Sequence, residues 1–247
     1  RTADVLQKVY TVGPQMVAGF AGAVELGFAM LEDMQACFQL PPGSIWFPRI
    51  SAWQWYRRAR RLYREAPESL RDLGCQLLLA GVSADSNGLS NRAYCLRMAA
   101  PEFTPEDAPV GSWRCIGSGR RHPDAKSFEA AFEDALNTFA VGETGMPGGM
   151  ATVAAISLSS AVRRHPMTSV GEAWVTAIAR VDGFQVSASR ERRDVGLPTE
   201  RTITVGQIAS SWDQFCALAA SHGAAPDAAS AGLRASGICL PIQFVAE

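Results

Sequence analysis

The stretch KVYTVGPQMVAGFAG, from Lys8 to Gly22, holds two short runs of β-branched and other apolar residues on either side of Gly13-Pro14. Two such runs around a glycine-proline turn predict a hairpin of two strands, Lys8 to Val12 and Met16 to Phe20. Alanine and glycine dominate the end of the second run, and such small residues occur where another backbone approaches closely. The hairpin is the first element of the fold that the rest of the sequence builds on.

Two long helices are expected after this hairpin. Ala23 to Phe38 carries apolar residues at helical spacing, and Pro41-Pro42-Gly43 then breaks the pattern. A second helical pattern runs from Ser51 to Gly74, and Pro67 is expected to kink or restart it. The residues expected to face the core are Val24, Phe28, Leu31 and Met34 in the first helix and Ala52, Tyr56, Ala59 and Tyr63 in the second.

Further strands and a second helix pair follow. The continuous apolar run Cys75 to Ala84 suits a strand buried on both faces, and AYCLRM (93–98) and Ser112 to Gly119 predict two more strands. Phe128 to Phe139 and Met150 to Arg163 show helical spacing, and EAWVTAIARVDGFQVSAS (172–189) predicts a hairpin around its Asp-Gly pair. Helices grouped in pairs between groups of strands favour an α+β fold over a doubly wound sheet.

The chain changes character beyond Arg190. A charged segment leads to a short helix that Ser210 or Ser211 could cap, and an alanine-rich stretch follows that we interpret as a weakly packed appendage. The sequence therefore predicts a main domain over residues 1–189 and a C-terminal extension over residues 190–247.

Composition narrows the functional classes. The 247 residues carry a net charge of −1, which does not indicate a nucleic-acid partner, and no apolar run is long enough to span a membrane. The six cysteines never form C-x-x-C, which fits small core residues in a reducing, cytoplasmic location. The three histidines are isolated, so no metal site is expected.

One basic segment allows two interpretations. RRARRLYRE (57–65) follows Trp53 and Trp55, and arginines interleaved with aromatics occur in nucleic-acid-binding surfaces. Its tyrosines and arginines, however, fall on opposite sides of the expected helix, which is typical of a solvated or interface helix. We favour the second interpretation and expect a stripe of Trp53, Arg57, Arg60 and Arg64 to take part in assembly.

Four motifs in order carry a family resemblance. KVYTVGPQMVAGFAGAVELGFAMLE, LLLAGVS, CIGSG and TSVGEAWVTAIARVDGF together resemble the β subunits of proteasomes and their bacterial relatives. This resemblance covers Lys8 to about Val186. It implies an N-terminal-nucleophile (Ntn) hydrolase with an α+β, four-layer αββα sandwich.

The resemblance also implies a set of site residues. In that family a processed N-terminal threonine attacks the substrate, its α-amine acts as base, and a lysine assists. Lys8 matches the lysine, Gly19 the glycine whose backbone N–H binds the oxyanion, and Ser118 a serine beside the terminal amine. Ser169 lies one place from the family's serine before the late hairpin, or matches it in a shifted alignment, with Gly171 in register and the family's aspartate absent. The implied pocket for a small apolar side chain is lined by Leu6, Val17 and Ala21.

The nucleophile itself is expected upstream of the given chain. Only seven residues precede Lys8, Thr2 is too close to serve, and Asp4 is the only carboxylate before it. Purely structural interpretations of the candidate site residues also stay open. Lys8 is also compatible with a solvated strand lysine, Gly19 with close packing, and Ser118 with a helix N-cap.

The leading functional hypothesis is a proteasome-like threonine protease subunit of a self-compartmentalising homo-oligomer, a ring or a helical stack. Its substrate would be a peptide or unfolded polypeptide, and the resemblance allows an ATP-dependent unfoldase as partner. No cofactor, nucleic acid or membrane is expected. The alternatives are a non-catalytic structural or regulatory assembly subunit and a small-molecule amidohydrolase of the same superfamily.

Overall fold

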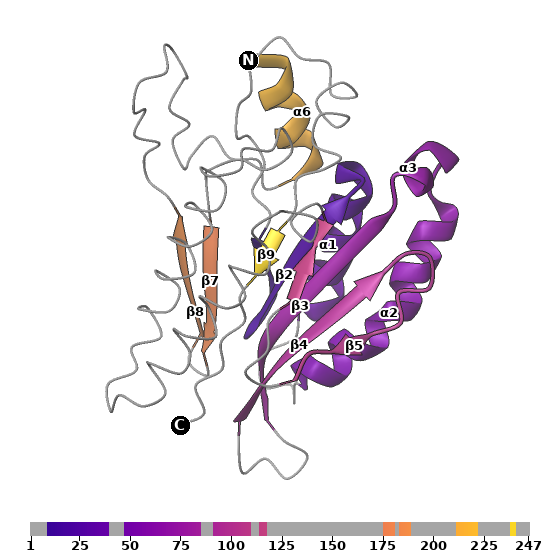
Figure 1. Cartoon of the computed structure of the whole chain (residues 1–247). Helices are drawn as coiled ribbons and strands as arrows, with labels where there is room; N and C mark the ends of the chain where they lie inside the picture. The colour runs from indigo at the N-terminus through magenta and orange to yellow at the C-terminus, as the bar shows by residue number, and fades with distance from the viewer. Residues whose placement is uncertain are drawn as a thin grey trace, which may run out of the picture.

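The computed structural model describes residues 9–39, 47–84, 91–109, 114–117, 175–180, 183–188, 211–221 and 238–240 (Figure 1). The second helix pair expected at Phe128 to Phe139 and Met150 to Arg163 lies outside the described residues. The described part contains helices and antiparallel strands, in agreement with the α+β class.

A five-stranded antiparallel sheet forms the centre of the described part. The strands follow one another in the order of the sequence, and every neighbouring pair is antiparallel. The strands are β1 (Val9–Gly13), β2 (Met16–Gly22), β3 (Cys75–Ala84), β4 (Asn91–Ala99) and β5 (Glu106–Asp107). The predicted first hairpin and the next two strands are confirmed, whereas β5 was not predicted.

The turn of the first hairpin is tied to the neighbouring strand. Gln15 adopts a positive φ of 59°, a conformation that non-glycine residues use mainly in tight turns. Its carbonyl oxygen accepts a hydrogen bond from the N–H of Val82 at 3.1 Å. Gly81 leaves room for this contact, because an added Cβ would lie 2.3 Å from the Gln15 oxygen. The hairpin and β3 are therefore locked together at this end of the sheet.

Three helices connect β2 to β3. They are α1 (Val24–Phe38), α2 (Pro48–Glu65) and α3 (Glu68–Asp72). Helix α2 begins three residues before the expected Ser51, because Pro48 takes the first helical position, where its fixed φ is favourable. It ends at Glu65 because Ala66 precedes Pro67 and is extended, with ψ of 149°. The restart after Pro67 is confirmed as α3.

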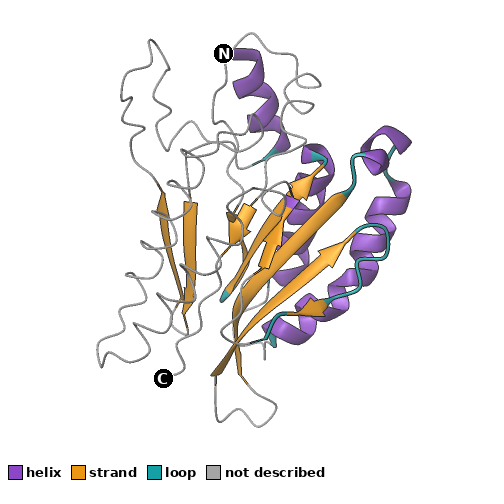
Figure 2. Cartoon of the chain, viewed as in Figure 1, coloured by secondary structure: helices purple, strands orange, loops and turns teal. Residues whose placement is uncertain are grey.

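The two long helices cover one face of the sheet (Figure 2). All four residues expected to be buried in α1 are buried. In α2 the buried aromatic residue is Trp55, whereas the expected Tyr56 and Tyr63 are only half-buried. The rings of Tyr10, Phe20 and Phe28 pack together between sheet and helices, with centroids 5.4–6.2 Å apart. This face holds the larger hydrophobic core.

Four short strands lie on the other side of the sheet (Figure 1). They pair as β6 with β9 and as β7 with β8, and β7 contacts β1, β2 and β3. Their bounds are β6 (Arg114–Ile116), β7 (Val175–Arg180), β8 (Gly183–Ala188) and β9 (Ile238–Leu240). The predicted late hairpin is confirmed as β7–β8. The described residues thus form three layers: helices, the five-stranded sheet and a second β-layer.

Two described pieces of the predicted extension contact the main domain. Helix α6 (Trp212–Ser221) contacts α1, and Trp212 packs against the core on the helix side. Ser211 is the residue that caps α6, since its Oγ accepts a hydrogen bond from the N–H of Gln214 at 3.3 Å. Strand β9 pairs with β6. The alanine-rich stretch that precedes β9 lies outside the described residues.

Candidate functional site

Three of the predicted site residues lie on β2 and share one face of the sheet. Side chains alternate along a strand, so Val17, Gly19 and Ala21 all belong to the face opposite the helices. Val17 and Ala21 are 4% and 1% exposed. They belong to a second, smaller apolar cluster formed by Val9, Val17, Ala21, Leu78, Ala80, Cys95, Ala108 and Ile116. We call this face, with its cluster, the inter-sheet face.

Gly19 lies in the interior of the five-stranded sheet. It is opposite Val9 of β1 on one side and Leu78 of β3 on the other. The N–H of such a residue points in the plane of the sheet towards a neighbouring strand. The oxyanion role of Gly19 stays a prediction, and it requires this N–H to point at the substrate.

The other four predicted site residues, Leu6, Lys8, Ser118 and Ser169, lie outside the described residues. The chain neighbours of two of them are described. Val9 follows Lys8 directly, is 3% exposed and lies opposite Gly19. Gly117 directly precedes Ser118, and its N–H donates a hydrogen bond to the side-chain oxygen of Gln76 at 3.1 Å.

Gln76 connects the second of these neighbours to β2. It lies directly opposite Ala21 in the ladder between β2 and β3. Ile116, one residue earlier in β6, is fully buried in the same cluster as Val17 and Ala21. Val9 therefore pairs with Gly19 of β2, and Gly117 bonds to the β3 residue opposite Ala21, two positions further along β2. Sequence reasoning missed Gln76, although an amide within an otherwise apolar strand was a visible signal.

The end of β2 requires glycine for a backbone reason. Gly22 has a φ of +107°, and a Cβ there would lie 2.3 Å from the carbonyl oxygen of Gly74. The same oxygen accepts a hydrogen bond from the N–H of Ala23 at 2.9 Å. Gly22 thus allows the chain to turn sharply from β2 into α1 beside β3.

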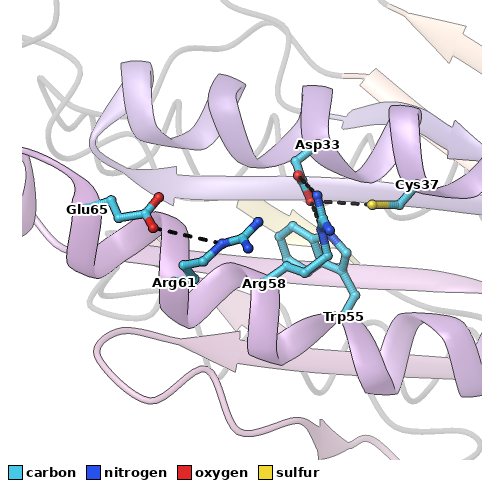
Figure 3. A network of polar contacts seen from close by, with 6 residues as sticks. All are labelled: Asp33, Cys37, Trp55, Arg58, Arg61 and Glu65. Atoms are coloured by element: carbon cyan, nitrogen blue, oxygen red, sulfur yellow. Dashed lines mark hydrogen bonds and ion pairs between the residues drawn. The ribbon is translucent and has the colours of Figure 1, made fainter.

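A second polar cluster joins α1 to α2 (Figure 3). Asp33 accepts hydrogen bonds from both Nε and Nη2 of Arg58, at 2.8 and 2.6 Å, and from the indole N–H of Trp55 at 2.8 Å. The hydrogen bonds from Arg58 hold the pKa of Asp33 below its ordinary value, so the carboxylate stays charged. Asp33 on α1 thereby accepts hydrogen bonds from two side chains of α2, and the cluster acts as a clamp between the two helices. The sequence alone did not reveal this cluster, because its residues come together only when α1 and α2 pack against each other.

The described cysteines fit a packing role. Cys75 and Cys95 are buried, as expected for small core residues, whereas Cys37 and Cys216 are half-buried. Burial raises the pKa of the Cys95 thiol to about 12. Burial also raises the pKa of Cys37, whose thiol donates a hydrogen bond to Asp33 at 3.6 Å. Both thiols are protonated at neutral pH and are poor nucleophiles.

Three of the six arginines of α2 form close ion pairs with acidic partners. Arg49 pairs with Asp107 at 2.6 Å, and Arg60 pairs with Glu102 at 2.7 Å. Together with the clamp at Arg58, these pairs neutralise part of the basic stripe. They favour the interface or solvated helix over a nucleic-acid surface.

The part of the chain that the structure describes offers neither a metal centre nor a membrane-spanning helix. No group of three His, Cys, Asp or Glu side chains there could hold a metal ion. None of the helices described is long and apolar enough to cross a bilayer.

The described residues thus define an α+β protein with a helix-covered antiparallel sheet and a candidate site on its inter-sheet face. No protein-family model and no curated protein matches the chain. Among solved structures it is similar to Anbu (ancestral beta-subunit) from Yersinia bercovieri, with 16% identity and a TM-score of 0.46. That match covers 74% of this chain and 69% of the other. At this identity and TM-score the likeness does not define an activity.

Proposed function

We propose that the chain is a proteasome-like subunit of the Ntn-hydrolase class, with its site on the inter-sheet face. One observation carries this proposal. Val9 and Gly117, the described neighbours of Lys8 and Ser118, are far apart in the sequence; Val9 pairs with Gly19 of β2, and Gly117 bonds to Gln76, the β3 partner of Ala21. Residues beside two of the motifs that suggested a hydrolase thus lie on the same face of the sheet, and this supports the proposal.

The proposed chemistry is acyl transfer to a hydroxyl. The α-amine of the expected N-terminal nucleophile accepts the hydroxyl proton, and the ammonium of Lys8 favours the resulting alkoxide by its charge. The oxygen attacks the amide carbonyl, the C–N bond breaks, and the leaving amine takes the proton. Water then hydrolyses the ester and restores the hydroxyl. Val17 and Ala21 would border a pocket that accepts only small apolar side chains.

The proposal extends to the layers and the assembly. The two helices expected between residues 119 and 174 would cover the outer side of the second β-layer and complete an αββα sandwich. The subunits would form a closed homo-oligomer that hydrolyses peptides inside it. Support comes from the three described layers and from the exposed aromatic and arginine residues of α2.

The test is peptide hydrolysis by the natural gene product and two variants at Lys8. We expect Lys8→Ala to lower turnover by about 100-fold, the scale of a positioned acid–base group, while the fold is retained. Lys8→Arg should fail to restore activity, because the larger planar guanidinium does not place its charge where the compact ammonium does. Lys126→Ala, which alters the chain's other lysine, is the matched control and should cleave like wild type. Unchanged turnover in folded Lys8→Ala would reject the assignment.

A second candidate is a non-catalytic assembly subunit with the same layers. The interior ladder position of Gly19 and the burial of Val17 and Ala21 favour it, because neither presents a donor or an open pocket. A folded, assembled natural protein without any peptide hydrolysis would support this candidate over the enzyme.

A further inference from the structure

The outer face of the helical layer, on the side of α1 and α2 away from the sheet, carries two stripes of opposite character. We propose that a second copy of this chain docks on this face, with α1 of each copy lying antiparallel against α2 of the other. This inference deepens the proposed assembly role and rests on it, but it does not depend on any catalytic step.

The stripe on α2 is apolar at one end and cationic at the other. Ile50 and Trp53 are 53% and 46% exposed, although both are large hydrophobic residues. Arg57, Arg61 and Arg64 continue the same side of the helix and are also exposed. Among the described residues neither Arg57 nor Arg64 has an ion pair, and Arg61 only approaches Glu65 at 4.0 Å. The face therefore offers aromatic area and unneutralised positive charge.

The stripe on α1 alternates acidic and small residues. Glu25, Ala29, Glu32 and Ala36 are exposed at helical spacing, opposite the fully buried Met34. Within the described part of the chain, Glu25 and Glu32 form no ion pair. The α1 stripe thus supplies the negative charge and the small side chains that the α2 stripe lacks.

The two stripes match when the helices run antiparallel. Glu25 and Glu32 are seven residues apart, as are Arg57 and Arg64, so both pairs span about 10.5 Å of helix. With Glu32 opposite Arg57, Glu25 falls opposite Arg64 in the same register. Ala36 then falls opposite Trp53, where its small side chain leaves space for the indole ring. Charge and side-chain size are therefore complementary in one register.

A dimer with a two-fold axis forms this α1–α2 contact twice. Within one chain α1 and α2 already run antiparallel, with Asp33 beside Arg58 (Figure 3). A two-fold axis parallel to the helices places α1 of each copy over α2 of the other with nearly the same register, so the two contacts are equivalent. Docking α2 on α2 would instead bring arginines together, which like-charge repulsion opposes. An α1–α2 contact instead pairs Glu32 with Arg57 and Glu25 with Arg64.

The test is self-association of the full chain, measured by analytical ultracentrifugation, with charge-reversed variants. Arg57→Glu with Arg64→Glu, or Glu25→Lys with Glu32→Lys, should each weaken association by at least about 10-fold, because every pair becomes repulsive. An equimolar mixture of the two double variants should associate like wild type, because both contacts regain opposite charges. The quadruple variant should also recover. Glu68→Lys and Arg92→Glu, exposed charges away from the stripes, are matched controls that should change nothing.

Each outcome decides the proposal. Recovery in the mixture and in the quadruple variant supports the α1–α2 contact specifically. If the arginine variant alone loses association, or if the mixture stays dissociated, the arginines do not face the α1 stripe of a second copy and the inference is wrong. A stable oligomer whose association is unchanged in all variants would show that this surface is not the interface, but it would still support the proposed assembly role. A monomer at every concentration refutes both.

Discussion

The two faces of the five-stranded sheet are built from the same strands but hold different side chains. The helix-covered face contains large aromatic and aliphatic groups, among them Tyr10, Phe20 and Phe28. The inter-sheet face contains mostly small ones, such as Val17, Ala21 and Ala80. Large rings bury more area and stabilise the fold, whereas small side chains let a second β-layer approach closely. The first face therefore carries stability, and the second holds the candidate site residues of β2, Val17, Gly19 and Ala21.

The largest expected effect tests this division of stability. Phe28→Ala should lower the free energy of unfolding by about 3–5 kcal/mol, because the ring is fully buried among rigid neighbours. Val17→Ala, on the inter-sheet face, should cost only about 2 kcal/mol. Urea denaturation measures both, and equal losses would contradict a division of roles between the faces.

The turn that links β2 to the helix layer gives the next effect. Gly22→Ala should cost about 3 kcal/mol, because it combines a positive φ with a Cβ placed against the Gly74 oxygen. Gly74→Ala is a matched control, since its φ is +67° but no atom lies within 4 Å of the added Cβ. That variant should lose only about 1 kcal/mol. Similar losses at both glycines would show that the close approach is unimportant.

The clamp between α1 and α2 predicts a pH dependence. Asp33→Asn should lower stability by about 1–3 kcal/mol at neutral pH, because hydrogen bonds to a charged acceptor are weakened. Arg58 depresses the folded-state pKa of Asp33, so the contribution is present above the unfolded pKa of about 4 and is lost as pH falls through the folded value. The gap between wild type and variant should therefore shrink when urea denaturation is repeated near pH 3. A gap that stays constant would exclude the carboxylate as its origin.

The smallest effect is expected at the surface of the same layer. Arg49→Ala removes an ion pair as short as that of Arg58, but both of its side chains are about half exposed. The loss should stay below about 1 kcal/mol and vanish in high salt. A loss as large as that of Asp33→Asn would mean that burial does not distinguish these pairs.

Much of this fold could be predicted because its signals are local. The hairpin, the apolar run of β3 and the apolar spacing of α1 each lie within one short stretch of sequence. Strand β5 could not be predicted, since Glu106 and Asp107 show no apolar alternation and pair only because β4 lies beside them. Trp55 is buried in place of Tyr56 because Asp33, on another helix, accepts its indole N–H.

The candidate site, like the fold, has features that local sequence predicts and features that it does not. Lys8 and Ser118 could be selected from their flanking motifs, but the places of their described neighbours Val9 and Gly117 depend on the register of β1 and β3 against β2, which is non-local. The same register decides that the N–H of Gly19 points within the sheet, which its neighbours in sequence do not reveal. The sequence was thus sufficient to select candidate residues by type, whereas the direction of backbone N–H groups could be known only from the structure.

The most direct test of a hydrolase site on the inter-sheet face is mass spectrometry of the natural protein after treatment with a peptide epoxyketone. This electrophile reacts with a hydroxyl and an α-amine on the same N-terminal residue, the pair that the proposed mechanism requires. We expect an adduct on the N-terminal residue, strongly reduced in Lys8→Ala and unchanged in Lys126→Ala. No adduct on folded, assembled protein would contradict the enzymatic account and leave the non-catalytic subunit in its place.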